Sequence, residues 1–134
     1  MKYKKTYAPT FTTQTMITRL TLPLEPTLSI LKEATLDFKN RHIHVIIEGV
    51  SIKKSYRLLC LLQSQECVNC HILGNQWRIE QHLKTSDKSK WHINLYCHNP
   101  DKGQNNILIT RDHIIALANN GQDTLKNSQT MCTH

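Results

Sequence analysis

Cys67 and Cys70 are separated by two residues, and a third cysteine, Cys132, stands close to the end of the 134-residue chain. A C-x-x-C pair places two thiolates on one tight turn, which is the geometry that tetrahedral zinc needs from half of its ligands. Cys132 begins what would be a second such pair, whose last cysteine would fall just after His134. The spacing therefore predicts a zinc site, with buried or redox-active thiols as the alternative interpretation.

The rest of the composition fits reduced thiols in a soluble protein. The chain has five cysteines, an odd number, which suits a metal site better than a disulfide scaffold. It contains no apolar run of about 18 residues that would cross a membrane. It also starts with polar, threonine-rich sequence instead of an apolar signal core. We therefore expect one soluble domain, or one domain with an N-terminal extension, located in the cytoplasm and without a membrane partner.

The charge balance favours a polyanionic partner. There are 17 Lys and Arg residues against 10 Asp and Glu residues, which gives a formal net charge of +7. Such a chain attracts nucleic acid because each neutralised phosphate releases condensed counterions. Basic domains that bind no nucleic acid are also common, so the charge alone leaves the partner open.

The N-terminal part of the chain predicts an extended arm followed by a helix. Residues 1–26 are rich in threonine and proline, which favour extended structure. Within them, residues 16–22 alternate as a strand would, although an arm that docks only in a complete protein or complex is an alternative. Residues 28–38 space their apolar side chains near the helical period, and Thr27 stands where an N-cap would.

The middle of the chain alternates between strand and helix patterns. Residues 42–48 are β-branched and bounded by Asn40 and Gly49, so they predict a strand. Ser51 is then expected to cap a helix whose apolar side chains are dense over residues 56–62. Three further strand-like runs, separated by turn-rich segments, are expected at residues 76–83, 90–96 and 106–110.

Four aromatic or histidine residues in these strands receive structural interpretations. Trp77 and Trp91 sit in neighbouring predicted strands, where core packing is expected and stacking on a base is the alternative. His42 and His44 alternate along one predicted strand face. We expect that face to be simply polar and not a second metal site.

A longer motif surrounds the tripeptide Asp112-His113-Ile114. The sequence ILITRDHII at residues 107–115 is followed by GQD at 121–123, by Asn127 and by Met-Cys at 131–132. Together with the upstream cysteine pair, this order resembles the HNH endonuclease family in its zinc-stabilised form. The resemblance covers about residues 67–134.

The resemblance implies a ββα-metal fold, in which one strand ends in Asp-His, a loop crosses to a second strand, and a helix follows. The expected fold class is therefore α+β, with an HNH-type ββα-metal finger and zinc knuckle at the C-terminus, preceded by a helix-strand-helix region. The corresponding division is an arm at 1–26, the helix-strand-helix region at 27–66, and an HNH-like domain at 67–134 without its C-terminal helix.

The same resemblance assigns roles to three residues of the motif. His113 is implied to be the general base that takes a proton from the attacking water, which suits an imidazole because it changes charge near neutral pH. Asp112 is implied to bind the catalytic divalent ion, Mg²⁺ or Mn²⁺, because such hard cations prefer carboxylate oxygens. Asn127 corresponds to the middle asparagine of the family motif, whose amide fixes the loop and orients the histidine.

The cysteines and the chain end complete the comparison with the family. Cys67, Cys70 and Cys132 correspond to three of the four structural zinc ligands. In the family, the fourth zinc ligand, the last ligand of the catalytic ion and a basic helix would follow beyond His134. We therefore expect either a truncated form or a chain in which His134 substitutes as a zinc ligand and which is not a competent nuclease by itself.

Two positions inside the motif also depart from the family pattern. The family usually has proline where Ala116 stands and a Gly-Gly pair where Asn120 and Gly121 stand. Asparagine tolerates left-handed backbone, so the turn is expected to survive.

The prediction that follows is a metal-dependent HNH endonuclease that hydrolyses DNA phosphodiester bonds, with double-stranded DNA as the expected substrate. Arg111, Lys126 and Lys90 flank the motif and are expected to contact phosphates, although solvated side chains fit the same positions. Compact nucleases of this kind are often encoded by bacteriophages, which would place the protein in the host cytoplasm. The alternatives are a non-catalytic zinc module that binds nucleic acid or a protein partner, and a factor whose activity lies in residues 1–60.

Overall fold

The computed structural model describes residues 16–35, 44–53, 55–82 and 91–133. An antiparallel sheet of five strands has the order β1-β4-β5-β6-β7. Its strands are β1 (Met16–Pro23), β4 (Gln76–His82), β5 (His92–Asn99), β6 (Gln104–His113) and β7 (Ser128–Cys132). A separate hairpin consists of β2 (His44–Ile47) and β3 (Val50–Lys53).

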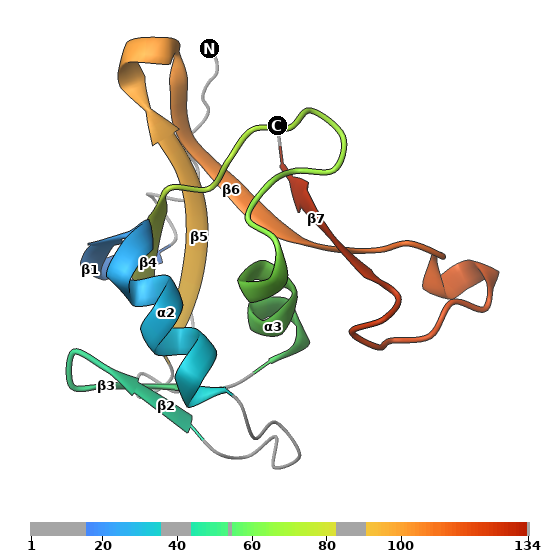
Figure 1. The fold of residues 1–134 in the computed structure, drawn as a ribbon, viewed down its shortest axis with the longest axis horizontal. Helices are drawn as coiled ribbons and strands as arrows, with labels where there is room; N and C mark the ends of the chain where they lie inside the picture. Colours follow the sequence, from blue (N-terminus) through green and yellow to red (C-terminus); the bar gives the residue numbers. More distant parts are fainter. Residues whose placement is uncertain (1–15, 36–43, 54, 83–90, 134) are drawn as a thin grey trace.

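Two helices lie against the sheet (Figure 1). Helix α2 (Leu24–Ala34) contacts β1 and β4, whereas α3 (Tyr56–Gln63) contacts β5, β6 and β7. Two short 3-10 helices lie in the connections on either side of β6. They are η2 (Pro100–Lys102), between β5 and β6, and η3 (Leu117–Asn119), between β6 and β7. The mixture of helix and sheet confirms the predicted α+β class.

The core lies between the helices, the hairpin and the sheet. Trp77 and Ile79 of β4 alternate toward it, as do Ile93 and Leu95 of β5, because successive strand side chains point to opposite faces. The buried apolar cluster consists of Leu28, Leu31, Val45, Ile47, Val50, Ile52, Leu58, Leu61, Leu62, Trp77, Ile79, Ile93, Leu95, Cys97 and Ile109. The indole nitrogen of Trp77 donates to the Leu24 carbonyl oxygen at 3.2 Å, so the prediction of core packing for Trp77 is confirmed.

The predicted strands after the second helix are all present, with shifted ends. The longest is β6, which continues to His113 instead of stopping at Thr110. Its last residues are polar and carry no apolar alternation, but they pair with β7, which supplies the backbone hydrogen bonds that keep them extended. The expectation that one strand ends in Asp-His is thereby confirmed.

The prediction that Ser51 caps the second helix was wrong. Glu48 and Gly49 have φ values of 50° and 78°, which form a tight hairpin turn, and the chain therefore returns as β3 with Ser51 inside the strand. Ser55 caps α3 instead, because its hydroxyl oxygen accepts a hydrogen bond from the backbone amide of Leu58 at 3.1 Å.

The start of the first helix also differs from the prediction. Helix α2 begins before Thr27, and the carboxylate of Glu25 accepts a hydrogen bond from the Ser29 amide at 3.0 Å. A carboxylate in the first turn also suits the positive end of the helix dipole. Thr27 is buried inside the helix, so its assignment as the N-cap was wrong. The helix ends at Ala34, and residues 36–38 of the predicted helix lie outside the described residues.

The N-terminal region contributes the edge strand β1, whose residues pair with β4 across a bulge between Thr18 and Leu20. This pairing selects the strand interpretation of residues 16–22.

The predicted division into 1–26, 27–66 and 67–134 stays a prediction. His44 is exposed on the hairpin and its Nδ1 lies 2.9 Å from the Ser51 hydroxyl, as expected of a polar strand face, while His42 lies outside the described residues.

Candidate active site and metal centre

The end of β6 presents the two residues of the Asp-His pair. Asp112 pairs with Gln129 of β7 and His113 with Ser128, so the site lies where the two strands begin to separate. Neighbouring side chains of a strand point to opposite faces. Asp112 is accordingly exposed to solvent, whereas the His113 side chain is only 24% exposed.

The loop of residues 114–127 joins β6 to β7 and is closed by one side chain, Asn127. Its Oδ1 accepts a hydrogen bond from the Ile115 amide at 2.9 Å, and its Nδ2 donates to the Ile115 carbonyl oxygen at 3.0 Å. The same Nδ2 donates to the Gln122 carbonyl oxygen at 2.8 Å. The Ile114 amide also donates to the Asn127 carbonyl oxygen at 3.0 Å. Asn127 thus fixes the backbone that immediately follows His113.

The backbone conformation of the loop accommodates the residues that differ from the usual family pattern. Asn120 has φ 69°, in the left-handed region that asparagine tolerates, so the expected turn is retained. Ala116 has φ −57° and ψ 144°, a conformation that proline also adopts. Gly121 approaches the preceding turn so closely that an added Cβ would lie 1.8 Å from the Ile115 carbonyl oxygen.

Asp123 and Arg111 surround the ring of His113. The Nε2 atom of His113 lies 3.1 Å from Asp123 Oδ1 and 3.2 Å from Arg111 Nη2. Arg111 Nη2 also donates to Asp123 Oδ1, and its Nε donates to the Ser128 hydroxyl at 2.7 Å. The guanidinium carbon of Arg111 lies 5.6 Å from the ring centroid of Tyr56 on α3. Arg111 of β6 and Asp123 of the loop thus contact the imidazole, and Ser128 of β7 and Tyr56 of α3 contact Arg111.

This arrangement has a clear electrostatic effect. Hydrogen bonds from His113 and Arg111 lower the pKa of the Asp123 carboxyl below its ordinary value. Asp123 therefore carries negative charge at neutral pH. The sequence prediction had named Arg111 as a phosphate contact, but its side chain is only 14% exposed and its donors are directed to protein acceptors.

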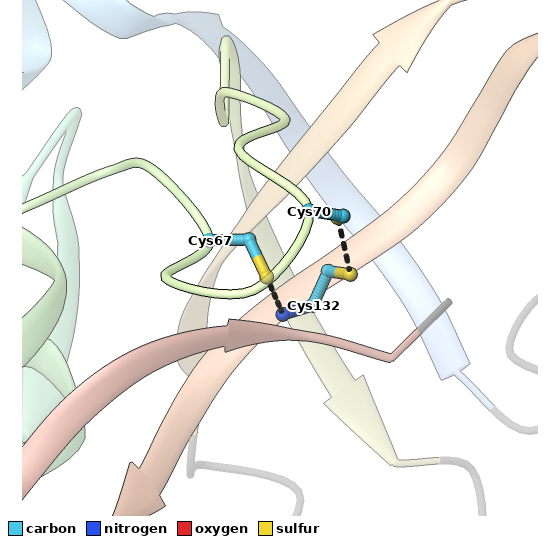
Figure 2. Close-up of side chains that lie close together, drawn as sticks. All are labelled: Cys67, Cys70 and Cys132. Atoms are coloured by element: carbon cyan, nitrogen blue, oxygen red, sulfur yellow. Dashed lines mark hydrogen bonds between the residues drawn. The ribbon is translucent and has the colours of Figure 1, made fainter.

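Cys67, Cys70 and Cys132 meet at the other end of β7 (Figure 2). Their sulfur atoms all lie within 4.8 Å of one another. One tetrahedral ion fits that spacing, because thiolate sulfurs bound at about 2.3 Å from zinc lie a little under 4 Å apart. Among the described residues, this is the group of three ligand atoms close enough to share one metal ion. The three cysteines that the sequence predicted are thus brought together.

Backbone amides around Cys67 favour the thiolate form of its side chain. Burial opposes ionisation of Cys67, but hydrogen bonds from the backbone amides of Cys70, Cys132 and Asn69 outweigh it and lower the pKa of the thiol to about 6. The Cys132 and Asn69 amides lie 3.3 and 3.4 Å from the Cys67 sulfur. A thiolate is the form that binds a metal ion.

The cysteine turn is also joined directly to β7. The Val68 amide donates to the Thr130 carbonyl oxygen at 3.0 Å, and the Thr130 hydroxyl donates to the Ser64 carbonyl oxygen at 2.8 Å. A metal bound at this turn would therefore fix the strand that follows Asn127.

The remaining residues that the sequence analysis named are Lys126, Trp91, Lys90 and His134. Lys126 is exposed beside Asn127. Trp91 is partly buried, and the Arg19 guanidinium lies 5.4 Å from the centroid of its ring. Lys90 and His134 lie outside the described residues.

Asp123 is the residue that the sequence prediction missed. It stands in the quoted motif, but no role was assigned to it. One signal was available, because Arg111 and His113 are two residues apart on one strand and therefore share a face on which a carboxylate would be stabilised. The conformation of the loop that brings Asp123 to that face was not predictable from its residues.

Comparison with known proteins supports the motif. The family model described as HNH endonuclease matches residues 95–134. That segment contains the second half of β5, all of β6 and β7, the closed loop and Cys132, and the match confirms the resemblance over these residues. It indicates a nuclease-like, metal-binding function. Cys67 and Cys70 lie before the matched segment, and the fold brings them to it.

Two further observations complete the comparison. No curated protein and no solved structure gave a significant match. None of the described helices is long and apolar enough to cross a lipid bilayer.

Proposed function

We propose that the protein is a metal-dependent HNH-type endonuclease that hydrolyses DNA phosphodiester bonds. The observation that carries this proposal is the position of His113. Its ring is held at the end of β6 by Asp123 and Arg111, directly before the loop that Asn127 closes, inside the segment that matches the family. A positioned imidazole that solvent can reach is suited to act as a general base, the role for which histidine is used most often.

In the proposed reaction, His113 takes a proton from a water molecule. The water oxygen forms a bond to phosphorus while the bond from phosphorus to the leaving oxygen breaks, and the leaving oxygen takes a proton from solvent. The negative charge of Asp123 stabilises the imidazolium that forms, because opposite charges at hydrogen-bond distance favour the charged form. Asn127 keeps the histidine in place through the backbone of Ile115.

Asp112 is the proposed ligand of the catalytic ion. Its carboxylate is exposed near the end of β6, one position before the proposed base in the chain. Mg²⁺ is often bound by one or two carboxylates together with substrate phosphates, so a single exposed aspartate fits such an ion, and Mn²⁺ is the alternative. When bound, the divalent ion supplies positive charge that stabilises the scissile phosphate and the leaving oxygen.

The cysteines are proposed to bind a structural zinc ion. Three convergent thiols, one of them with a pKa lowered to about 6, suit zinc better than a hard cation such as Mg²⁺. Because the cysteine turn bonds to Thr130 of β7, zinc would stabilise the strand on which the loop depends.

Double-stranded DNA is the proposed partner. The net charge of +7 favours a polyanion. Lys126 is exposed next to the loop and is proposed to contact a phosphate, as is Lys90. Arg111 is proposed to act chiefly within the protein, because its guanidinium already has Asp123 and Ser128 as partners.

A plasmid-nicking assay with Mg²⁺ or Mn²⁺ tests the proposal. Wild-type protein should convert supercoiled plasmid to the nicked form, and His113→Ala should be slower by at least about 100-fold, the usual contribution of a general base. His44→Ala removes an exposed histidine of the β2–β3 hairpin and is the matched control. Asp112→Ala should also be inactive, whereas Asp101→Ala on η2 should not.

Two results would contradict the proposal. Equal cleavage by wild type and His113→Ala would rule out the assigned base. DNA binding by the wild type without cleavage in either metal would favour the alternative, a non-catalytic zinc module.

A further inference from the structure

Asp123 contacts the proposed base from the far end of the β6–β7 loop. Its Oδ1 atom lies 3.1 Å from His113 Nε2, although the two residues are ten positions apart. The Asp123 side chain is 61% exposed, so burial alone would not hold it in place. Something else must fix the carboxylate if this contact is to persist.

Arg111 supplies that anchor. Its Nη2 donates to Asp123, and its Nε donates to the Ser128 hydroxyl at 2.7 Å. Ser128 in turn donates to the Thr124 carbonyl oxygen at 2.7 Å, inside the same loop. The guanidinium also lies over the ring of Tyr56. A charge-assisted hydrogen bond to an arginine held on two sides is a strong positional constraint on an exposed carboxylate.

Which ring nitrogen of neutral His113 carries the proton follows from the chemistry of its two neighbours. A carboxylate only accepts hydrogen bonds and a guanidinium only donates them. If Nε2 carries the proton, it donates to Asp123. If Nε2 carries the lone pair, it accepts from Arg111 and faces the negative oxygen of Asp123 at 3.1 Å. Arg111 already has two other acceptors, so the first arrangement satisfies more groups and avoids the repulsion.

We propose that Asp123 is a positioning residue that holds His113 in the Nε2–H tautomer, so that Nδ1 is the atom that accepts the proton of water. The hydrogen-bond partners of the ring among the described residues, Arg111 and Asp123, are both at Nε2, which leaves Nδ1 for the water. The functional half of this inference rests on the proposed endonuclease activity, whereas the tautomer is a property of the site that is measurable without DNA.

Long-range ¹H–¹⁵N correlation spectra of the histidine rings test the tautomer directly, because protonated and unprotonated ring nitrogens resonate far apart. The spectra are recorded on the protein loaded with zinc, at a pH where imidazoles are neutral. The resonances that disappear in His113→Ala are those of His113. We expect the Nε2–H form in the wild type. In Asp123→Ala, Arg111 remains as a donor to Nε2, so the ratio of the Nε2–H to the Nδ1–H form should fall by about tenfold or more.

A second variant separates charge from hydrogen bonding. Asp123→Asn keeps an oxygen that accepts from Nε2–H but removes the negative charge, so it should retain the Nε2–H form. Asp101→Ala, an exposed aspartate on η2, is the matched control and should match the wild type. Backbone amide spectra verify that each variant folds, which is expected because Asp123 is largely exposed.

The kinetic measurement distinguishes positioning from substrate binding. Asp123→Ala should lower kcat for plasmid cleavage by about 10- to 100-fold with little change in KM, because Asp123 acts through His113 and not on DNA. Wild-type protein in the Nδ1–H form, or an unchanged tautomer ratio in Asp123→Ala, would overturn the inference. An Nε2–H form that depends on Asp123, in a protein that cuts no DNA, would support the tautomer and refute the endonuclease.

Discussion

Replacing Asn127 with alanine should open the β6–β7 loop while leaving the sheet intact. The substitution removes three side-chain hydrogen bonds, two with the backbone of Ile115 and one with Gln122. Each is worth roughly 0.5–1.5 kcal/mol net, so the sum is about 3 kcal/mol. Ile115 and Gln122 are exposed and their freed groups can bond to water, which reduces the expected loss to about 2 kcal/mol.

Hydrogen exchange at one amide measures this loss. The Ile114 amide donates to the backbone carbonyl oxygen of Asn127, so its partner survives the substitution and its exchange reports only opening of the loop. A loss of about 2 kcal/mol corresponds to an exchange rate about 30-fold faster. Asn105→Ala, at an exposed position of β6, is the control. Ile114 exchange within about twofold of the wild type would refute the view that Asn127 closes the loop.

Three further changes test the loop and the metal centre. Gly121→Ala should destabilise the protein by about 2 kcal/mol, because its Cβ would lie 1.8 Å from the rigid backbone oxygen of Ile115; an unchanged thermal melt would contradict this. Cys132→Ser should reduce the zinc content measured by atomic absorption from about one ion per chain to near zero, while Cys60→Ser, which removes a buried thiol outside the cluster, should retain it. In metal-free, reduced protein the folded-state pKa of Cys67 is lowered to about 6, so its thiolate contributes stability that is fully present above the ordinary thiol pKa of about 9 and is lost as the pH falls toward 6. The difference in the free energy of unfolding between wild type and Cys67→Ser, measured by urea unfolding, should therefore become smaller from pH 9 to pH 6. A difference that stays constant over this range would contradict the assigned pKa.

Local patterns predicted much of the fold. The strands after the second helix could be found because alternating apolar residues and turn-forming separators encode a strand within a few residues. Ser51 shows the limit of such reasoning. Both Ser51 and Ser55 precede an apolar run, and only the hairpin turn at Glu48 and Gly49, with its positive φ values, decides which serine caps α3.

The sequence by itself determined the chemistry that is present: three cysteines with metal-ligand spacing, and an Asp-His pair followed at a fixed distance by Asn127. These assignments depend on residue type and spacing along the chain, which the sequence states directly. The tertiary structure showed how the predicted cysteines meet, and it alone decided which residue contacts His113. Pairing of β6 with β7 brings Cys132 to Cys67, and the closed loop between the two strands brings Asp123 to His113. A contact across such a loop depends on the packing of the whole hairpin against α3, and for that reason the partner of the proposed base emerged only from the folded chain.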